Sequence, residues 1–305
     1  MTVVYLWSRS RECRGNLRED CDGSEPGISA PAQCTTLRSQ AQKIWVDLSR
    51  AHRRGRPRSE ETITENFLDE IQDAHPQQIF AYSFNKREDG YTGADWEWWL
   101  TDDHEWLGLL IQAKRLSSGS HKYEGIKRWS PGTGMAQIDA VLQQAKWKGI
   151  DALYCFYNYD SSSPGHLSWN CNMPLAAPAM FGCTVALAQA VKGQLYLGGA
   201  GLPKMSAISY PLGCLVCCPV LAGTPDSSLP RRAEGVIQGL RALSDGASEM
   251  TPVAADRPGL RREPPSYVRR LLDAPLDGRG PIIEELRREA GSIGTLVIIR
   301  EPREG

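Results

Sequence analysis

The sequence predicts an α/β fold, with a mixed sheet flanked by helices, because two different periodicities alternate along the chain. Segments with apolar residues three or four positions apart are typical of helices; they are 37–51, 60–74 and 135–148. Shorter apolar or alternating runs are typical of strands; they are 78–86, 94–100, 107–116 and 152–158. After a first helix, the predicted order is therefore helix, three strands, helix and strand.

The local sequence explains most of these elements. An arginine-rich turn at 50–58 separates the first two helices, and glutamates at the start of 60–74 suit the positive end of a helix dipole. A short polar turn joins 94–100 to 107–116, so we expect these two strands to be antiparallel neighbours. The apolar, aromatic run 152–158 is expected to be a central strand of the sheet.

The rest of the chain is less regular. We expect a helix at 183–191 and a short buried strand at 213–220. In the tail we expect helices at 267–272 and 282–290, followed by a strand at 295–300.

These patterns divide the chain into four predicted parts. They are a poorly ordered extension over 1–35, an α/β domain over 36–222, a linker over 223–265 and a small C-terminal appendage over 266–305. The linker assignment depends on its content of Pro, Gly, Ser and Arg and on its lack of periodicity.

Composition limits the classes of protein that the chain can belong to. Of the 305 residues, 41% are hydrophobic and 23% are charged, which excludes a wholly disordered, collagen-like or coiled-coil chain. The formal net charge is −1, so any attraction to nucleic acid or to an acidic membrane must come from local patches.

The cysteines and the N-terminus indicate a cytoplasmic protein. Nine cysteines are scattered without a disulfide framework, and 1–20 has no apolar stretch of the length that a signal peptide needs. We therefore expect free thiols in a reducing compartment. The uncharged stretch 161–191 is interrupted by prolines, so we expect no membrane span.

Polar side chains gather on one face of the predicted hairpin. Asp95 and Glu97 alternate with tryptophans on the first strand, and Gln112 and Lys114 share a face of the second. Because the two strands are neighbours, an acid, an amide and an ammonium group can converge at one point.

This convergence suits the metal-dependent hydrolysis of a phosphodiester. Mg²⁺ (or Mn²⁺) prefers oxygen ligands, which Asp95, the Gln112 carbonyl and Glu97 offer. Lys114 can hold a water and offset charge on phosphate oxygens. A second acid from the preceding helix would complete the site; the candidates are Glu60, which we favour, Glu61 and Glu65.

The order of elements and these motifs resemble the PD-(D/E)xK nuclease superfamily, and the Gln-x-Lys-Arg strand end is similar to Mrr-type restriction endonucleases. The resemblance implies a restriction-endonuclease-like core with Asp95, Gln112, Lys114 and Glu60 as catalytic residues. Gln112 departs from the acidic residue that is usual at its position. The further Gln-x-x-x-Tyr motif is missing, because the residue four positions after Gln137 is Val141.

The run 36–158 also resembles an uncharacterised bacterial family of unknown function. The motifs that carry this second resemblance are Trp-x-Asp-Leu (45–48), a glutamate-rich helix start (60–65), Gly-Ala-Asp-Trp-Glu-Trp-Trp (93–99), Gln-Ala-Lys (112–114), Gln-Ile-Asp (137–139) and Leu-Tyr-Cys-Phe-Tyr-Asn (153–158).

The predicted partner is nucleic acid, with DNA expected. Arginines next to the site are candidates for phosphate contacts, although runs of charge are commonly solvated surfaces; they are Arg53, Arg54, Arg56 and Arg115. Three tryptophans at 96–99 could stack on bases, but packing in the core is the preferred interpretation. The alternatives are a nuclease-like fold that binds nucleic acid or protein without cleavage, and an unrelated interaction protein. A homodimer or an activating protein partner is left open.

Overall fold

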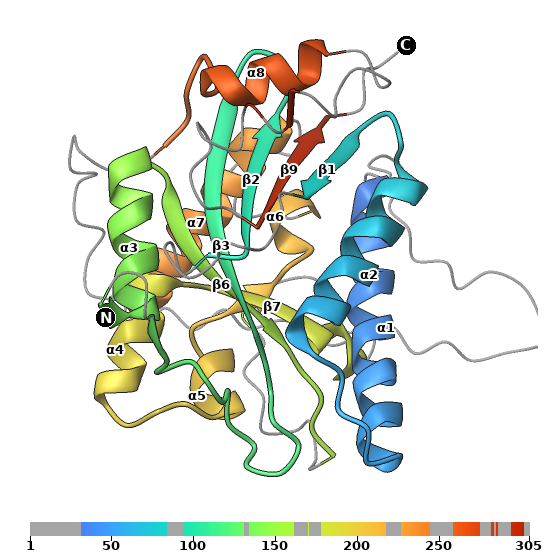
Figure 1. Cartoon of the computed structure of the whole chain (residues 1–305), viewed down its shortest axis with the longest axis vertical. Coiled ribbons are helices and arrows are strands. Elements are labelled where there is room, and N and C mark those ends of the chain that lie inside the picture. The colour runs from blue at the N-terminus through green and yellow to red at the C-terminus, as the bar shows by residue number, and fades with distance from the viewer. Residues whose placement is uncertain are drawn as a thin grey trace, which may run out of the picture.

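A computed structural model of the chain describes residues 32–83, 94–130, 134–161, 170, 178–217, 227–244, 259–274, 282–283, 285 and 294–301. Its centre is a seven-stranded mixed sheet with the strand order β1-β9-β2-β3-β6-β7-β8 (Figure 1). The strands are β1 (Ile79–Ser83), β2 (Trp96–Thr101), β3 (Trp106–Arg115), β6 (Asp151–Tyr157), β7 (Cys183–Leu187), β8 (Tyr210–Pro211) and β9 (Thr295–Arg300). The predicted mixed α/β sheet is therefore confirmed.

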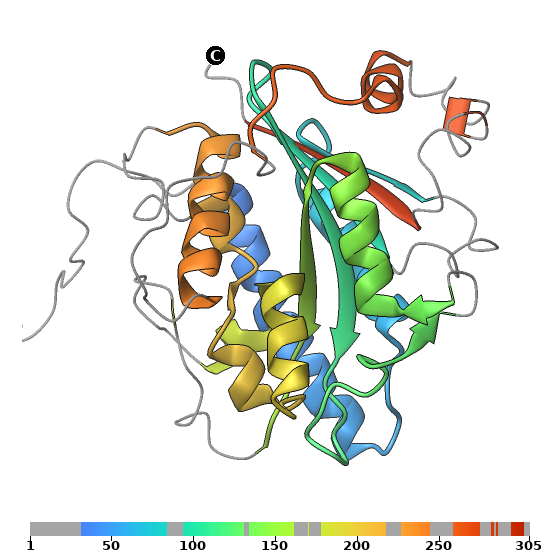
Figure 2. The same ribbon diagram turned by 90° about the vertical axis from the view of Figure 1, so that its left-hand side faces the viewer.

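Helices cover both faces of this sheet and bury one apolar cluster on each. The first face carries α1 (Ala32–Arg53), α2 (Glu60–Ala74), α6 (Cys214–Cys217) and α7 (Leu229–Ser244). The second face carries α3 (Gln137–Lys148), α4 (Ala188–Tyr196), α5 (Leu202–Ser206) and α8 (Ser266–Asp273). Figure 2 shows the sheet between α7 (orange) and α3 (green). The small elements are β4 (Trp129–Ser130), β5 (Met135–Ala136) and a 3-10 helix at Pro178–Gly182.

The predicted hairpin is present and positions the candidate site. β2 and β3 are antiparallel, with Trp96 opposite Ile111 and Thr101 opposite Trp106. On its other edge β3 pairs in parallel with β6, which places Gln112 opposite Tyr154. β3 therefore lies inside the sheet, with all of its residues but the last buried.

Two predicted elements have the wrong secondary structure. The segment 183–191 was expected to be a helix, but Cys183–Leu187 is strand β7, paired with β6, and α4 begins only at Ala188. The segment 213–220 was expected to be a strand, but Cys214–Cys217 is the short helix α6. Short apolar runs do not distinguish a buried strand from a buried helix, because neither exposes a polar face.

The C-terminal part differs most from the expectation. The expected linker contains α7, whose residues Leu229, Val236 and Leu240 are completely buried in the first cluster. The expected strand of the appendage is present as β9, but it lies inside the sheet, antiparallel to β1 and parallel to β2. The helix expected at 267–272 is confirmed by α8. Of the extension expected at 1–35, residues 1–31 lie outside the described residues, whereas 32–35 are the first residues of α1. Most of the helix expected at 282–290 also lies outside them.

The cysteines correct a second expectation. Cys34 on α1 and Cys217 on α6 form a disulfide with a Cα–Cα distance of 5.2 Å, so these two are not free thiols. Cys155, Cys183 and Cys214 are buried and are not part of this disulfide. None of the helices in the described ranges is long and apolar enough to cross a lipid bilayer.

Candidate active site

Asp95 lies one residue before β2 and is fixed by its backbone between two strands. Its N–H donates to the carbonyl of Ile111 at 3.0 Å, and its own carbonyl accepts from the N–H of Thr295 at 3.0 Å. The carboxylate atom Oδ2 accepts hydrogen bonds from Gln112 Nε2 at 2.6 Å and from the Ala113 N–H at 2.8 Å. The structure therefore brings together Asp95 and Gln112, as the alternation of the two strands predicts.

The amide of Gln112 continues this contact to the start of α3. Its Oε1 accepts from Nε2 of Gln137 at 3.0 Å, and Gln137 is the first residue of that helix. Oε1 of Gln137 is buried and has no hydrogen-bond partner among the described residues. The sequence offers Gln137 only within the Gln-Ile-Asp motif of the resemblance and does not indicate its place in the site.

Lys114 and Glu60 form the other half of the site. Lys114 Nζ lies 3.6 Å from Glu60 Oε2, and Glu60 Oε1 accepts from the Arg115 N–H at 3.0 Å. Glu60 begins α2, where Ser59 caps the helix by accepting a hydrogen bond from the Thr62 N–H. Of the three candidate acids at this helix start, Glu60 is therefore the one that pairs with Lys114. Nearly all of the Lys114 side chain is buried, whereas 31% of the Glu60 side chain is exposed.

Tyr154 is a polar group of the site that the sequence does not indicate. It lies opposite Gln112 in the register of β3 and β6 and is fully buried. Its hydroxyl has no hydrogen-bond partner in the described part of the chain. Burial, and then the negative charge of Asp95, raise the pKa of this hydroxyl, so it stays protonated and can donate a hydrogen bond at neutral pH. In the sequence, Tyr154 is hidden within an apolar, aromatic strand.

Glu97, which was expected to be a metal ligand, belongs to a different cluster. Its carboxylate is completely buried and accepts from Trp99 Nε1 at 2.6 Å, from Lys148 Nζ at 2.8 Å and from the Tyr267 hydroxyl. Its hydrogen bonds thus join β2 to the end of α3 and to α8. The three donors that hold Glu97 are Trp99, Lys148 and Tyr267, and neither Asp95 nor Gln112 is among them.

The donor atoms around Asp95 fit a hard cation that completes its shell with water and substrate oxygens. The described residues contain no group of three or more His, Cys, Asp or Glu side chains that could hold a metal ion. Asp95 and Gln112 each offer a side-chain oxygen here, and Mg²⁺ is commonly bound through one or two carboxylates plus phosphate. Gln112 turns its Nε2 toward Asp95, so a half-turn of this amide is needed to present Oε1. Gln137 can turn with it, because its Oε1 is unpaired among the described residues.

Three of the four predicted basic residues line surface pockets, whereas the predicted aromatic residues are buried. Arg54 and Arg56 line a pocket between α1 and α2, and Arg115 lines an adjoining one. Arg53 lines neither, and its guanidinium donates to Ser49 along α1. The tryptophans are completely or almost completely buried, so they pack in the core and cannot stack on a ligand; they are Trp96, Trp98 and Trp99.

Comparison with known proteins assigns the family without assigning an activity. A family of unknown function, DUF6615, has a model that matches residues 33–305. The chain belongs to DUF6615. No curated protein and no solved structure matches the chain. The DUF6615 match includes Asp95, Gln112, Lys114 and Glu60, and it also includes α7, α8 and β9, which complete the sheet and its cover.

Proposed function

We propose that this DUF6615 chain is a Mg²⁺- or Mn²⁺-dependent nuclease that hydrolyses phosphodiester bonds of DNA. One observation carries the proposal: Asp95 is hydrogen-bonded to Gln112 on β3, and two residues further along that strand the buried Lys114 pairs with the glutamate that begins α2. The contacts that support it are Asp95 with Gln112 and Lys114 with Glu60. The order of elements and the Gln-x-Lys-Arg strand end resemble Mrr-type nucleases, which supports the same reaction.

Each residue has a role that follows from its contacts. Asp95 and Gln112 would hold the metal, which when bound supplies a Lewis acid and a water of lowered pKa. Lys114 positions the attacking water and offsets the negative charge that develops on the phosphate oxygens. Glu60 holds the Lys114 ammonium in place. The unused hydrogen bond of the buried Tyr154 hydroxyl would go to the Asp95–Gln112 pair when the amide turns toward the metal, and solvent protonates the leaving oxygen.

Cleavage of plasmid and single-stranded DNA, with Mg²⁺ or Mn²⁺, tests the proposal. We expect Asp95→Ala and Lys114→Ala each to lose about a hundredfold in rate or more, the usual loss when one charge-stabilising group is removed. Asp73→Ala is the matched control for the aspartate, and Lys204→Ala is the matched control for the lysine. Both residues are exposed: Asp73 lies in the last turn of α2, and Lys204 lies on α5. Unchanged cleavage by Asp95→Ala would place the chemistry elsewhere.

A second candidate function is binding of nucleic acid or protein without cleavage. The neutral Gln112 favours it, since the usual acid at this position would give the metal a second negative charge. If the unmodified protein binds DNA but cleaves no substrate with either metal, this candidate replaces the first.

The cytoplasmic location belongs to the same proposal. The Cys34–Cys217 disulfide weighs against it, because cytosolic thiols are normally kept reduced. Counting reactive thiols in protein isolated under non-reducing conditions decides the matter. An activating partner or a second copy of the chain is required only if the purified protein binds DNA and fails to cut it.

A further inference from the structure

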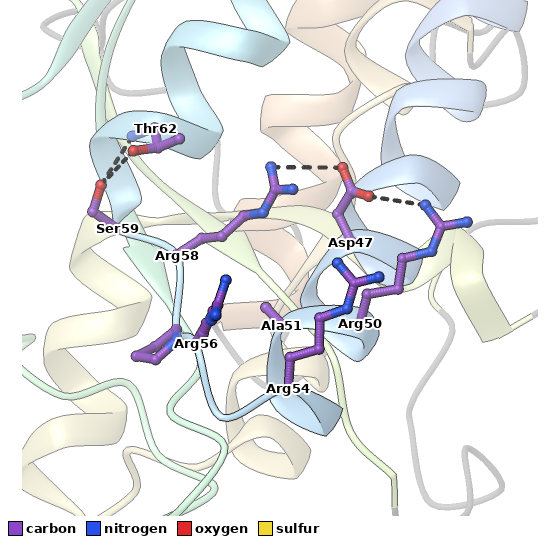
Figure 3. Close-up of a pocket in the computed structure, with 9 residues that line it drawn as sticks. Asp47, Arg50, Ala51, Arg54, Arg56, Arg58, Ser59 and Thr62 are labelled. Carbon is purple, nitrogen blue, oxygen red and sulfur yellow. Dashed lines mark hydrogen bonds and ion pairs between the residues drawn. The ribbon is translucent and has the colours of Figure 1, made fainter.

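A pocket lined by four arginines lies where α1 ends and α2 begins (Figure 3). Its volume is about 500 Å³, within the range of sites that hold small molecules or single nucleotides. The arginines are Arg50, Arg54, Arg56 and Arg58. We call this site the arginine pocket.

The backbone holds these arginines in place from both ends. Gly55 has φ 62°. Its N–H donates to the backbone carbonyl of His52, and the Arg56 N–H donates to the backbone carbonyl of Ala51. This is the pattern of a Schellman motif, which ends α1 sharply. Ser59 caps α2 on the other side of Pro57, so the connection between the helices is short and closed at both ends. The side chains of Arg54, Arg56 and Arg58 are therefore carried by a defined turn.

The pocket has an excess of positive charge. Asp47 is the only acid that lines it, so four arginines against one aspartate leave a formal charge of +3. Arg50 and Arg58 lie 3.5 and 3.9 Å from the Asp47 carboxylate, which they approach from opposite sides in Figure 3. Arg54 and Arg56 form no ion pair with any described residue. Two guanidinium groups are thus available to an anion, and guanidinium binds phosphate oxygens in a bidentate manner.

The lining also limits the kind of anion. No aromatic side chain of the described residues lines the pocket, and the Ser59 hydroxyl is already used as the cap of α2. A base would find no aromatic ring to stack on here. The pocket therefore suits the phosphate and sugar of a strand and does not select a sequence.

The arginine pocket adjoins a second pocket that reaches Arg115, the residue after Lys114. A neighbouring pocket of about 200 Å³ shares Arg56, Pro57 and Arg58 with it and is also lined by Arg115. Arg115 follows Lys114 directly, and its N–H is bound by Glu60, the residue after Ser59. A strand whose phosphodiester lies at Lys114 can thus extend its backbone along this surface.

We propose that the arginine pocket binds a phosphate group of the polynucleotide strand on which the active site acts. The inference rests on the proposed nuclease function and adds the place where the strand is held. The phosphate can be internal or can be the terminal monoester of the strand, and the experiment separates these two sources.

Binding is measured by fluorescence anisotropy in EDTA, so that no cleavage interferes. The probes are short single-stranded and duplex oligonucleotides, each with and without a terminal phosphate. The variant is Arg54→Ala with Arg56→Ala. The control, Arg262→Ala with Arg269→Ala, removes the same charge from exposed positions at and before α8, which lies at the opposite end of the molecule from the α1–α2 turn (Figure 1).

We expect the pocket variant to bind about tenfold more weakly at physiological salt, with the slope of log K against log salt reduced by about one to two. The control should stay within about twofold of the unmodified protein, since its charges are distant from the strand. A loss limited to probes with a terminal phosphate assigns the pocket to the strand end. An equal loss for all probes assigns it to internal phosphates.

The outcomes separate this inference from the proposed function. If the pocket variant binds like the control, the inference is wrong even where Asp95→Ala abolishes cleavage. If the pocket variant is weakened but the unmodified protein never cleaves, the pocket stands and the nuclease function falls. If the unmodified protein binds no oligonucleotide, both fall.

Discussion

Two carboxylates that are two residues apart, Asp95 just before β2 and Glu97 on it, lie in very different surroundings. Glu97 belongs to a buried cluster with Trp99, Lys148 and Tyr267, in which three donors surround its carboxylate. Asp95 belongs to a group with Gln112 and Tyr154 in which buried polar atoms are left without partners among the described residues. We call them the Glu97 cluster and the Asp95 cluster.

The difference shows how to distinguish a structural polar cluster from a functional one. A buried polar group without a partner costs about 1–3 kcal/mol, so a fold does not keep such groups for stability alone. The Glu97 cluster fastens α3 and α8 to the sheet and leaves its acid no capacity for a ligand. On the proposed function, the Tyr154 hydroxyl and Gln137 Oε1, which have no partner among the described residues, take new partners when the Asp95 cluster binds its ligand.

Replacing Lys148 in the Glu97 cluster and Lys114 next to the Asp95 cluster should give the largest contrast. Lys148→Met leaves the fully buried Glu97 without its counter-charge and should lower the free energy of unfolding by about 3–5 kcal/mol. Lys114→Met should lower it by only about 1 kcal/mol, because water reaches the partly exposed Glu60. Urea unfolding followed by circular dichroism measures both losses.

Cleavage should respond in the opposite order. Lys114→Met loses about a hundredfold in rate, whereas Lys148→Met keeps its rate per folded molecule. Equal losses of stability in the two variants would remove the distinction between the clusters.

The two tyrosines give a smaller contrast of the same kind. Tyr267→Phe removes a donor to the buried Glu97 carboxylate and should cost about 1.5–3 kcal/mol of stability, with no effect on cleavage. Tyr154→Phe removes a buried hydroxyl that has no described partner, so stability should be unchanged or rise by up to about 1 kcal/mol. Its cleavage rate should nevertheless fall about tenfold, as expected when a hydrogen bond to a charged group is lost.

Thermal unfolding and single-turnover cleavage of both variants decide the matter. A Tyr154→Phe protein that is less stable and cleaves normally would show that this hydroxyl has only a structural role.

The two clusters also show what the sequence can and cannot predict. Alternation along a hairpin fixes the face on which a side chain lies, and this was enough to bring Asp95 to Gln112. It does not fix which residues lie opposite that face, so it could not show that Glu97 pairs with Lys148 on α3. Tyr154 could not be separated from its apolar neighbours, because an aromatic strand residue is as typical of a core as of a site.

The same limit applies to the fold. The hairpin depends on contacts that are close in sequence, and it was predicted correctly. β9 pairs with β1 and β2, which lie about two hundred residues earlier, and no local pattern specifies such neighbours. In α7, Pro230 and two glycines resemble a linker, although its apolar residues face the sheet.

Changing Gln112 to an acid should have the smallest effect, and it tests the metal directly. Gln112 Nε2 lies 2.6 Å from Asp95 Oδ2, so Gln112→Glu places two carboxyl groups at hydrogen-bond distance. Their repulsion raises the pKa of one of them and should destabilise the metal-free protein by about 1 kcal/mol at neutral pH. A divalent cation relieves this repulsion, so Mg²⁺ should raise the melting temperature of Gln112→Glu more than that of the unmodified protein. Gln77→Glu, in the exposed turn before β1, adds the same charge away from the site and should not respond to Mg²⁺. An equal response in all three proteins would mean that no cation binds between residues 95 and 112, and the Asp95 cluster would then have to act on its ligand without a metal.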